Sequence, residues 1–232
     1  MNLKEELHEL AKANNMDYFG VAPVHRFHNI PAGHKPCDLL PKAKSVIVLG
    51  MRIPAGAIEA NNRAYEGLRH AIFSYVAFGY NKVNENLDNA ALHVVLHIEK
   101  KHRNKAYPIP AGGPRDEYLM MSTMSNRYAA VCAGLGLFGW SGFVLTQQDG
   151  PRVRWVSIIT EANLKPDPLY KGPPLCDRSQ CDICIQACPV GALSDHEAVK
   201  VEIEEHRSEY STRNKPLCRC ATTGLVKGTP GR

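Results

Sequence analysis

The chain has 232 residues, of which 44% are hydrophobic and 22% are charged, as expected for a globular protein with one substantial domain and a small appendage. Its net charge of +5 comes without a dense block of lysine and arginine, so composition gives no signal for nucleic acid and instead suits anionic small molecules. No window approaches the roughly 18 consecutive apolar residues of a membrane span, and the first residues show no export signal. We therefore predict a cytoplasmic protein.

The first half of the chain predicts helices packed around short strands. Leucines at helical spacing predict an opening helix that ends near residues 14–15. Residues 18–23 and the apolar run 45–51 predict strands, with a loop over 25–41 between them. Helices are predicted over 61–80 and 85–102, then an extended piece at 106–110 and a turn at 111–114. His93 and His97 are four apart on the second helix and could share a metal, although packing or surface histidines are the commoner explanation.

The second half predicts one more helix, a glycine loop and a hairpin. Residues 117–132 have a helical pattern and run into the glycine-rich segment 133–142. Residues 143–146 and 153–160 are β-rich, and 147–151 would connect them as a hairpin. The segment 165–174 contains four prolines and predicts a linker. After Gly191 we expect a short helix, and we expect the polar tail from residue 212 to be partly loose, apart from Cys218 and Cys220.

Four closely spaced cysteines carry the clearest chemical signal, in the pattern Cys176-x4-Cys181-x2-Cys184-x3-Cys188-Pro189. Bacterial ferredoxins hold iron–sulfur clusters with a run that ends in Cys-Pro, and the last three cysteines here have that spacing. Zinc is the main competitor, because Cys-x2-Cys pairs also build tetrahedral zinc sites. The Cys-Pro ending favours iron and sulfide.

The number of cysteines limits how many clusters the chain can hold. Six of the eight cysteines lie between Cys176 and Cys220, and two fully thiolate-ligated four-iron clusters need eight. One [4Fe–4S] cluster is therefore the first choice. Because the Cys-Pro cysteine serves the other cluster in two-cluster ferredoxins, a second cluster with Cys188, Cys218 and Cys220 stays open.

Glycines and arginines mark two further candidate sites. Gly134, Gly136 and Gly139 have the spacing of a dinucleotide fingerprint, but a predicted helix precedes them and a strand follows, which excludes that fold. The loop either lets backbone approach a flat ligand or simply caps a helix. Arg152 and Arg154 alternate at the start of a predicted strand and so share a face, where they suit a carboxylate or phosphate or are merely solvated.

Several segments together resemble the cobalamin-dependent reductive dehalogenases and epoxyqueuosine reductases. The likeness covers roughly residues 3–193, and its most specific parts are the order of Ala133-Gly134-Leu135-Gly136, Gly150-Pro151-Arg152-Val153-Arg154 and the cysteine run. The resemblance implies an α+β fold, with a nitroreductase-like corrinoid-binding domain over residues 1–170 and a ferredoxin-like iron–sulfur module over 171–232. The module would pass single electrons to cobalt, for reductive chemistry on a small molecule.

By this resemblance the cofactor-binding candidates lie around the glycine loop, and they are Gly134, Gly136, Gly139, Ser141, Arg127 and Arg154. Arg152 would lie on the substrate side. The sequence departs from the family in three ways. It lacks an export signal, the second ferredoxin motif is replaced by Cys218-Arg219-Cys220, and the acidic proton-donor segment is missing. Asp116 or Tyr118 could supply the proton instead.

Two alternatives to a corrinoid reductase stay open from the sequence. The protein could be an accessory electron-transfer or corrinoid-reducing protein without an organic substrate of its own. It could also hold FMN, since nitroreductase-like domains also bind flavins. A reduced ferredoxin or flavodoxin is the expected electron donor, and both a monomer and a homodimer are compatible with the sequence.

Overall fold

A four-stranded antiparallel sheet forms the centre of the computed structural model, which describes residues 2–112, 116, 118 and 120–230. The strands lie in the order β1, β2, β6 and β3, with the bounds Tyr18–Pro23, Ser45–Arg52, Val153–Thr160 and Ala106–Ile109. β3 lies at an edge of the sheet, where Pro108 is tolerated because an edge strand can lack one hydrogen-bond donor. The predicted strands at 18–23, 45–51 and 106–110 are confirmed.

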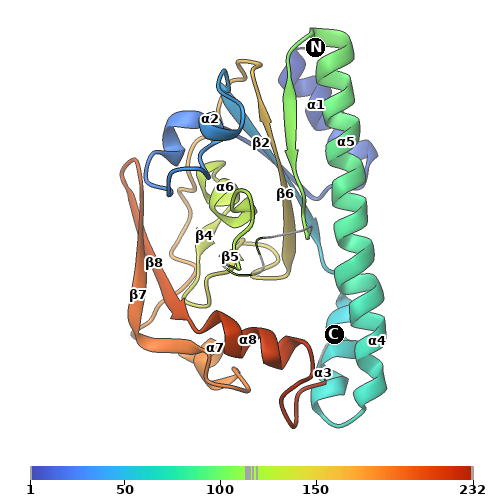
Figure 1. Cartoon of the computed structure of the whole chain (residues 1–232), viewed down its shortest axis with the longest axis vertical. Coiled ribbons are helices and arrows are strands. Elements are labelled where there is room, and N and C mark those ends of the chain that lie inside the picture. Colours follow the sequence, from blue (N-terminus) through green and yellow to red (C-terminus); the bar gives the residue numbers. More distant parts are fainter. Residues whose placement is uncertain (1, 113–115, 117, 119, 231–232) are drawn as a thin grey trace.

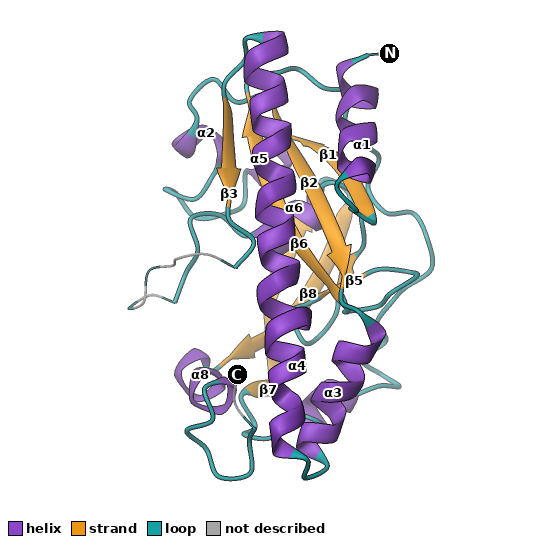
Figure 2. Ribbon diagram, turned by 90° about the vertical axis from the view of Figure 1, so that its right-hand side faces the viewer, coloured by secondary structure: helices purple, strands orange, loops and turns teal. Residues whose placement is uncertain are grey.

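Helices cover both faces of this sheet (Figures 1 and 2). α1 (Leu3–Ala13) and the long α5 (Lys82–His102) pack on one face, and α6 (Asn126–Cys132) packs on the other. In β2, Val46 and Val48 point into the core under α6, whereas Ile47 and Leu49 point into the core under α1 and α5. Because both faces are buried, this strand is continuously apolar rather than alternating.

The predicted helix over 61–80 is wrong in its boundaries. α3 (Ala55–Tyr65) begins directly after Pro54 and ends before Gly67, whose φ of +116° breaks the helical backbone. A second helical stretch then leads without a gap into α5, through η2 (Arg69–Ala71), α4 (Ile72–Ser74) and the π-helical η3 (Tyr75–Asn81). The break therefore falls at the glycine and not near residue 81.

The segment before the glycine loop also differs from the prediction over 117–132. The helix begins only at Asn126, where the Ser125 side chain accepts a hydrogen bond from the backbone N–H of Tyr128 and caps it. Before it, Asp116 and Met121 form an isolated antiparallel bridge. The predicted turn at 111–114 lies partly outside the described residues. The predicted loop at 25–41 contains two short helical turns, η1 (Val24–Phe27) and α2 (Pro36–Leu39).

The predicted hairpin between 143–146 and 153–160 is wrong in its pairing. β5 (Val144–Leu145) pairs with β4 (Leu137–Phe138), while β6 lies between β2 and β3 in the large sheet. Residues 146–150 form a tight loop that a bridge between Thr146 and Gly150 closes. β-propensity identified the strands, but it does not select their partners.

The C-terminal part forms a β-hairpin and two helices instead of the predicted short helix and loose tail. β7 (Leu193–Ile203) pairs with β8 (His206–Arg213), and α7 (Ile183–Gln186) and α8 (Lys215–Thr222) flank this hairpin in sequence. Val201 and Ile203 alternate with charged residues and join the core under α6. The segment 161–182 is irregular, as expected of a linker, but its Leu164 and Leu169 are buried. In the part of the chain that the structure describes, no helix combines the length and hydrophobicity of a membrane span.

Candidate functional site

The six C-terminal cysteines lie on and around α7 and α8, at the end of the molecule that also holds α3 (Figure 1). Cys181 is exposed and the other five are half-buried. The remaining two cysteines stand apart, as predicted from their positions in the sequence. Cys37 is exposed on α2, and Cys132 is buried in α6, where burial raises the pKa of its thiol well above the usual range.

Electrostatic interactions show which groups lie near the cysteines. The pKa of the Cys184 thiol is raised first by burial and then by Cys176, with a smaller contribution from Cys181, so these three lie together. The pKa of Tyr65 on α3 is raised first by burial and then by nearby groups that include the thiols of Cys188 and Cys218. Cys188 and Cys218 therefore lie near α3, and Cys188 also follows Cys184 by about one helical turn at the end of α7.

Backbone N–H groups already point at two of these sulfurs. Trp140 N–H donates to Cys176 Sγ over 3.4 Å, and Ala192 N–H donates to Cys188 Sγ over 3.2 Å. Such hydrogen bonds stabilise thiolate over thiol, and in iron–sulfur proteins they tune the reduction potential. The donor set and its hydrogen bonds therefore fit an iron–sulfur cluster.

The spacing of the sulfurs is not that of a single zinc ion. Among the described residues, no three cysteine sulfurs lie within 4.8 Å of one another. Four thiolates about 2.3 Å from one zinc ion lie roughly 4 Å apart, whereas a cluster spreads its ligands over a larger core. The arrangement is therefore wider than a mononuclear zinc site.

Cys220 faces a different side of α8 from Cys218. Residues two apart on a helix point about 200° away from each other. Cys220 and Arg219 line a cavity of about 380 Å³, together with Met120, Pro216, Thr223 and Leu225. The structure thus brings Cys220 toward the part of the chain around Met120.

The glycine loop is shaped by packing within the chain. Gly134 has a φ of +74°, and the hydrogen bonds from Gly134 N to Val131 O and from Leu135 N to Ala130 O close α6 as a Schellman cap. A Cβ atom at Gly134 would lie 2.0 Å from Pro168 O, and one at Gly136 would lie 2.2 Å from Leu145 O. The helix-cap explanation is therefore confirmed, and a ligand role for the loop stays a prediction.

Two arginines converge on the turn that follows the glycine loop. Arg127 donates to Gly142 O, and Arg213 donates to Ser141 O over 2.7 Å. Both guanidinium groups lie within 6 Å of the centre of the Phe143 ring, at 5.9 and 5.7 Å. Burial, and then the charge of Arg213, lower the pKa of Arg127. Within the described residues neither arginine has a carboxylate partner, so this turn carries concentrated positive charge.

Arg213 is a candidate site residue that the sequence did not indicate. It is the last residue of β8, more than 80 positions from Arg127, and no local motif surrounds it. The hairpin of β7 and β8 brings it to the glycine loop, where Ser211 N–H donates to Trp140 O over 2.8 Å. Only the pairing of β7 with β8 could have revealed that Arg213 lies at the glycine loop.

The other predicted residues lie elsewhere. Arg154 bonds to Asn84 Oδ1 and lies 4.3 Å from the centre of the Tyr80 ring, so it packs against η3 and α5. Arg152 is exposed just before β6, and Tyr118 is 94% exposed. Together with Asp116 and its bridge to Met121, they do not share any described contact with the Arg127 and Arg213 pair.

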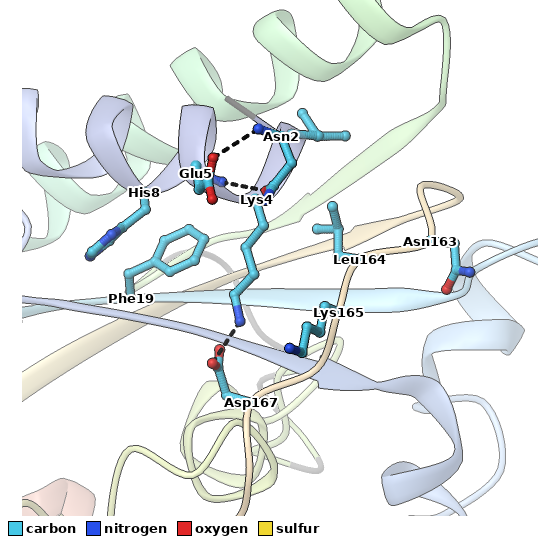
Figure 3. A pocket seen from close by; sticks show the side chains of 10 residues that line it. Asn2, Lys4, Glu5, His8, Phe19, Asn163, Leu164, Lys165 and Asp167 are labelled. Carbon is cyan, nitrogen blue, oxygen red and sulfur yellow. Dashed lines mark hydrogen bonds and ion pairs between the residues drawn. The ribbon is translucent and has the colours of Figure 1, made fainter.

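One cavity, of about 570 Å³, lies between α1 and the segment 163–167 (Figure 3). Lys4 and Asp167 form an ion pair of 2.6 Å at its wall, and Lys165 and Phe19 also line it. None of the cysteines or predicted site residues borders this cavity. Its position does not support a role in the redox chemistry.

Comparison with known proteins finds relatives of two kinds. The chain is 26% identical over 215 residues to an epoxyqueuosine reductase of Bacillus subtilis (strain 168), which covers 82% of the chain and 51% of that protein. It is 25% identical over 230 residues to a tetrachloroethene reductive dehalogenase of Desulfitobacterium hafniense, covering 97% of the chain and 37% of that protein. The chain thus spans about half the length of the first relative and little more than a third of the second. No family model matches it.

Solved structures of the same two kinds have a similar fold. An epoxyqueuosine reductase with a modified tRNA stem loop gives a TM-score of 0.55 at 22% identity, covering 82% of the chain and 52% of that structure. A catabolic reductive dehalogenase in complex with 3-bromo-4-hydroxybenzoic acid gives a TM-score of 0.63 at 16% identity, covering 97% of the chain and 30% of that structure. A third structure is that of a reductive dehalogenase described in terms of B12-dependent dehalogenation. Its TM-score is 0.63 at 15% identity, covering 97% of the chain and 30% of that structure. The mixed α/β architecture is therefore that of these reductases.

Proposed function

Because the chain belongs to the superfamily of epoxyqueuosine reductases and reductive dehalogenases, we propose that it is an iron–sulfur reductase that delivers single electrons to a corrinoid. In this proposal residues 1–170 form the nitroreductase-like, corrinoid-binding domain and residues 171–232 form the ferredoxin-like module. The relatives offer no support for FMN, and flavin is not part of the proposal.

The observation that carries the proposal is the position of Trp140 between the glycine loop and the cysteines. Its backbone N–H donates to Cys176 Sγ, and its indole N–H donates to Ser194 O over 3.0 Å. The Arg178 guanidinium lies 4.5 Å from the centre of its ring and donates to Cys181 O over 3.1 Å. Trp140, which follows Gly139, thus contacts both Cys176 and Arg178. An electron donor held by the first three cysteines and an electron acceptor at the glycine loop would therefore be neighbours.

The cysteines would hold the electron donor. A bound [4Fe–4S] cluster supplies one electron at a time. Cys176, Cys181 and Cys184 are the proposed ligands near Trp140, with Cys188 as the fourth in a single-cluster arrangement. The shared proximity of Cys188 and Cys218 to Tyr65 instead supports the arrangement with two metal groups, in which the first three cysteines would need one further ligand and the pair of Cys188 and Cys218 would need two. Cys220 is the weakest candidate, because it faces the cavity beside Met120.

The arginine pair would hold the acceptor. Arg127 and Arg213 lie beside Ser141 and the half-exposed Phe143 without a carboxylate partner among the described residues, and their positive charge suits an anionic group on a large ligand. The two cavities described above have the volume of a drug-sized ligand, and a corrinoid is larger. We therefore place it on the open surface at this turn. The exposed Tyr118 or Asp116 would deliver the proton, and Arg152 would lie on the substrate side.

Metal analysis of cysteine variants tests the proposal. Anaerobically prepared protein is expected to contain iron and sulfide in equal amounts, with about four iron atoms for each cluster. Cys184→Ala is expected to lose this iron, because it removes a ligand from the neighbourhood of Trp140. The matched control Cys37→Ala removes an exposed cysteine on α2 and is expected to keep all of it. Equal iron in both variants, or zinc alone in the native chain, would contradict the proposal.

The variant Cys218→Ala then distinguishes one cluster from two. If Cys188 completes a single cluster with the first three cysteines, Cys218→Ala keeps the native iron content. If Cys188 and Cys218 serve a second metal group, the variant loses about four iron atoms. The electron paramagnetic resonance spectrum of the reduced protein provides an independent count of the clusters.

A further inference from the structure

Three side chains of α5 gather around one carboxylate oxygen of α1, far from the cysteines in sequence. Glu6 Oε2 lies 2.8 Å from His97 Nε2, 3.2 Å from Lys101 Nζ and 3.5 Å from His102 Nε2. The side chains of Glu6, His97 and His102 are only 17%, 21% and 29% exposed. Figures 1 and 2 show α1 alongside the C-terminal end of α5, where these three side chains lie.

We propose that Glu6, His97 and His102 form a binding site for a divalent transition metal, for which Zn²⁺ is the probe. Their three ligand atoms all lie within 4.8 Å of one another. An ion about 2.0–2.1 Å from each of them needs ligand separations of roughly 3.3 Å, so small side-chain rotations suffice. Two imidazole nitrogens and one carboxylate oxygen are a zinc ligand set, and they leave the fourth position to water.

The Glu6 carboxylate and the carbonyl end of α5 favour a cation at the three ligands, whereas the Lys101 ammonium opposes one. His102 is the last residue of α5, where the carbonyl end of a helix carries partial negative charge. Hydrogen bonds from His97 and then Lys101 lower the pKa of Glu6 to about 2, so its carboxylate is ionised at neutral pH. The Lys101 ammonium occupies part of the space that an ion would take. Its side chain is 62% exposed and can withdraw into solvent.

The pair that the sequence suggested, His93 with His97, is not the one that the structure brings together. His93 Nδ1 lies 2.6 Å from Asn14 Oδ1, whereas the rings of His97 and His102 lie 5.8 Å apart. Glu6 could not be found from the α5 pattern, because it lies on the opening helix. An ion bound here would join α1 to α5 and would stabilise the folded chain through its preference for that state.

Zinc titration of the full chain tests the site against a matched control. The double variant with His97→Asn and His102→Asn is expected to bind one zinc ion fewer per chain than the native protein, and to lose a zinc-dependent rise in melting temperature. His93→Asn removes a histidine of the same helix and is expected to keep both. The thiolates are present in every variant, so the difference in stoichiometry reports on this site alone. Equal stoichiometry in the double variant and the native chain would overturn the proposal.

Two spectroscopic readouts keep the test independent of whether the variants fold. In the native protein, histidine nitrogen resonances of His97 and His102 should shift on addition of zinc, and that of His93 should not. When the thiols have been alkylated before cobalt is added, cobalt bound at this site should give visible bands of nitrogen and oxygen ligation without the near-ultraviolet charge-transfer band of thiolates. Unmoved resonances of His97 and His102 at saturating zinc would exclude the site, whatever the cysteines bind.

Discussion

Replacing Gly134 with alanine is expected to lower the free energy of unfolding by about 3 kcal/mol or more, the sum of two separate costs. The residue has a φ of +74°, a backbone conformation that strains any residue with a Cβ atom. The added Cβ would also lie 2.0 Å from Pro168 O, a backbone atom that cannot rotate away. Thermal or urea unfolding of the native and variant chains measures the loss, which corresponds to a fall in melting temperature of roughly 6–12 °C.

Gly33→Ala separates the two costs. Gly33 has a similar φ of +84°, but nothing lies within 4 Å of the position of its missing Cβ. Gly33→Ala is therefore expected to lower the free energy of unfolding by only about 1 kcal/mol, from the backbone conformation alone. Equal losses in the two variants would mean that Pro168 does not pack against the α6 cap. That result would also argue against close packing between the glycine loop and the segment leading to the cysteines.

Replacing Arg26 with methionine is expected to destabilise the chain by about 3 kcal/mol, because a buried cation with three partners is lost. Arg26 is 7% exposed, and its guanidinium donates to Cys132 O and Asp167 O, each over 2.8 Å, and to Glu204 Oε1 over 2.9 Å. These partners belong to the end of α6, the irregular segment before the cysteines and the turn between β7 and β8. Denaturant unfolding should show the loss.

Arg207→Met is the matched control on the same hairpin. Arg207 lies 3.5 Å from Glu202 with both side chains largely exposed, so the expected change is at most about 1 kcal/mol. A similar loss in both variants would argue against Arg26 as the group that attaches the hairpin to the core.

The stabilisation of the folded chain by Arg26 should also depend on pH. Hydrogen bonding to Arg26, and to a lesser degree to His25, holds the pKa of Glu204 below its usual value of 4.5, against the opposing effect of burial. The unfolded chain therefore binds the proton more readily than the folded chain, and the stabilisation is complete above the unfolded pKa. It is lost as the pH falls through the lowered folded pKa. The difference between the native chain and Arg26→Met should accordingly shrink in acid, and a constant difference would contradict the pairing.

Local patterns in the sequence predicted the elements that short-range physics determines. The opening helix, the strands at 18–23 and 45–51 and the extended segment at 106–110 were all confirmed, because periodicity and continuous apolar runs report directly on burial. The elements that were wrong depend on partners distant in sequence. β5 pairs with β4 and not β6, and the charged residues around Val201 form a strand because β8 lies beside them.

The same division holds for the candidate site. The spacing of the cysteines singled out the proposed metal-binding end, and the structure places these cysteines on and around α7 and α8. The orientation of Cys218 relative to Cys220 required knowing that α8 is a helix, whereas the sequence predicted a partly loose tail in which only these two cysteines would be held. Arg213 and the group of Glu6, His97 and His102 form only through tertiary contacts, which no local spacing encodes.

The most direct test of the account is electron transfer from the iron-loaded chain to hydroxocobalamin, followed by anaerobic stopped-flow absorbance. After reduction and removal of excess reductant, the native protein should reduce the corrinoid while its own cluster absorbance recovers, and the two rates should be the same. Cys37→Ala should behave like the native chain, and Cys184→Ala should fail. If the native protein binds no corrinoid, or reduces it no faster than Cys184→Ala does, the cysteine end and the glycine loop do not form the redox pair proposed here.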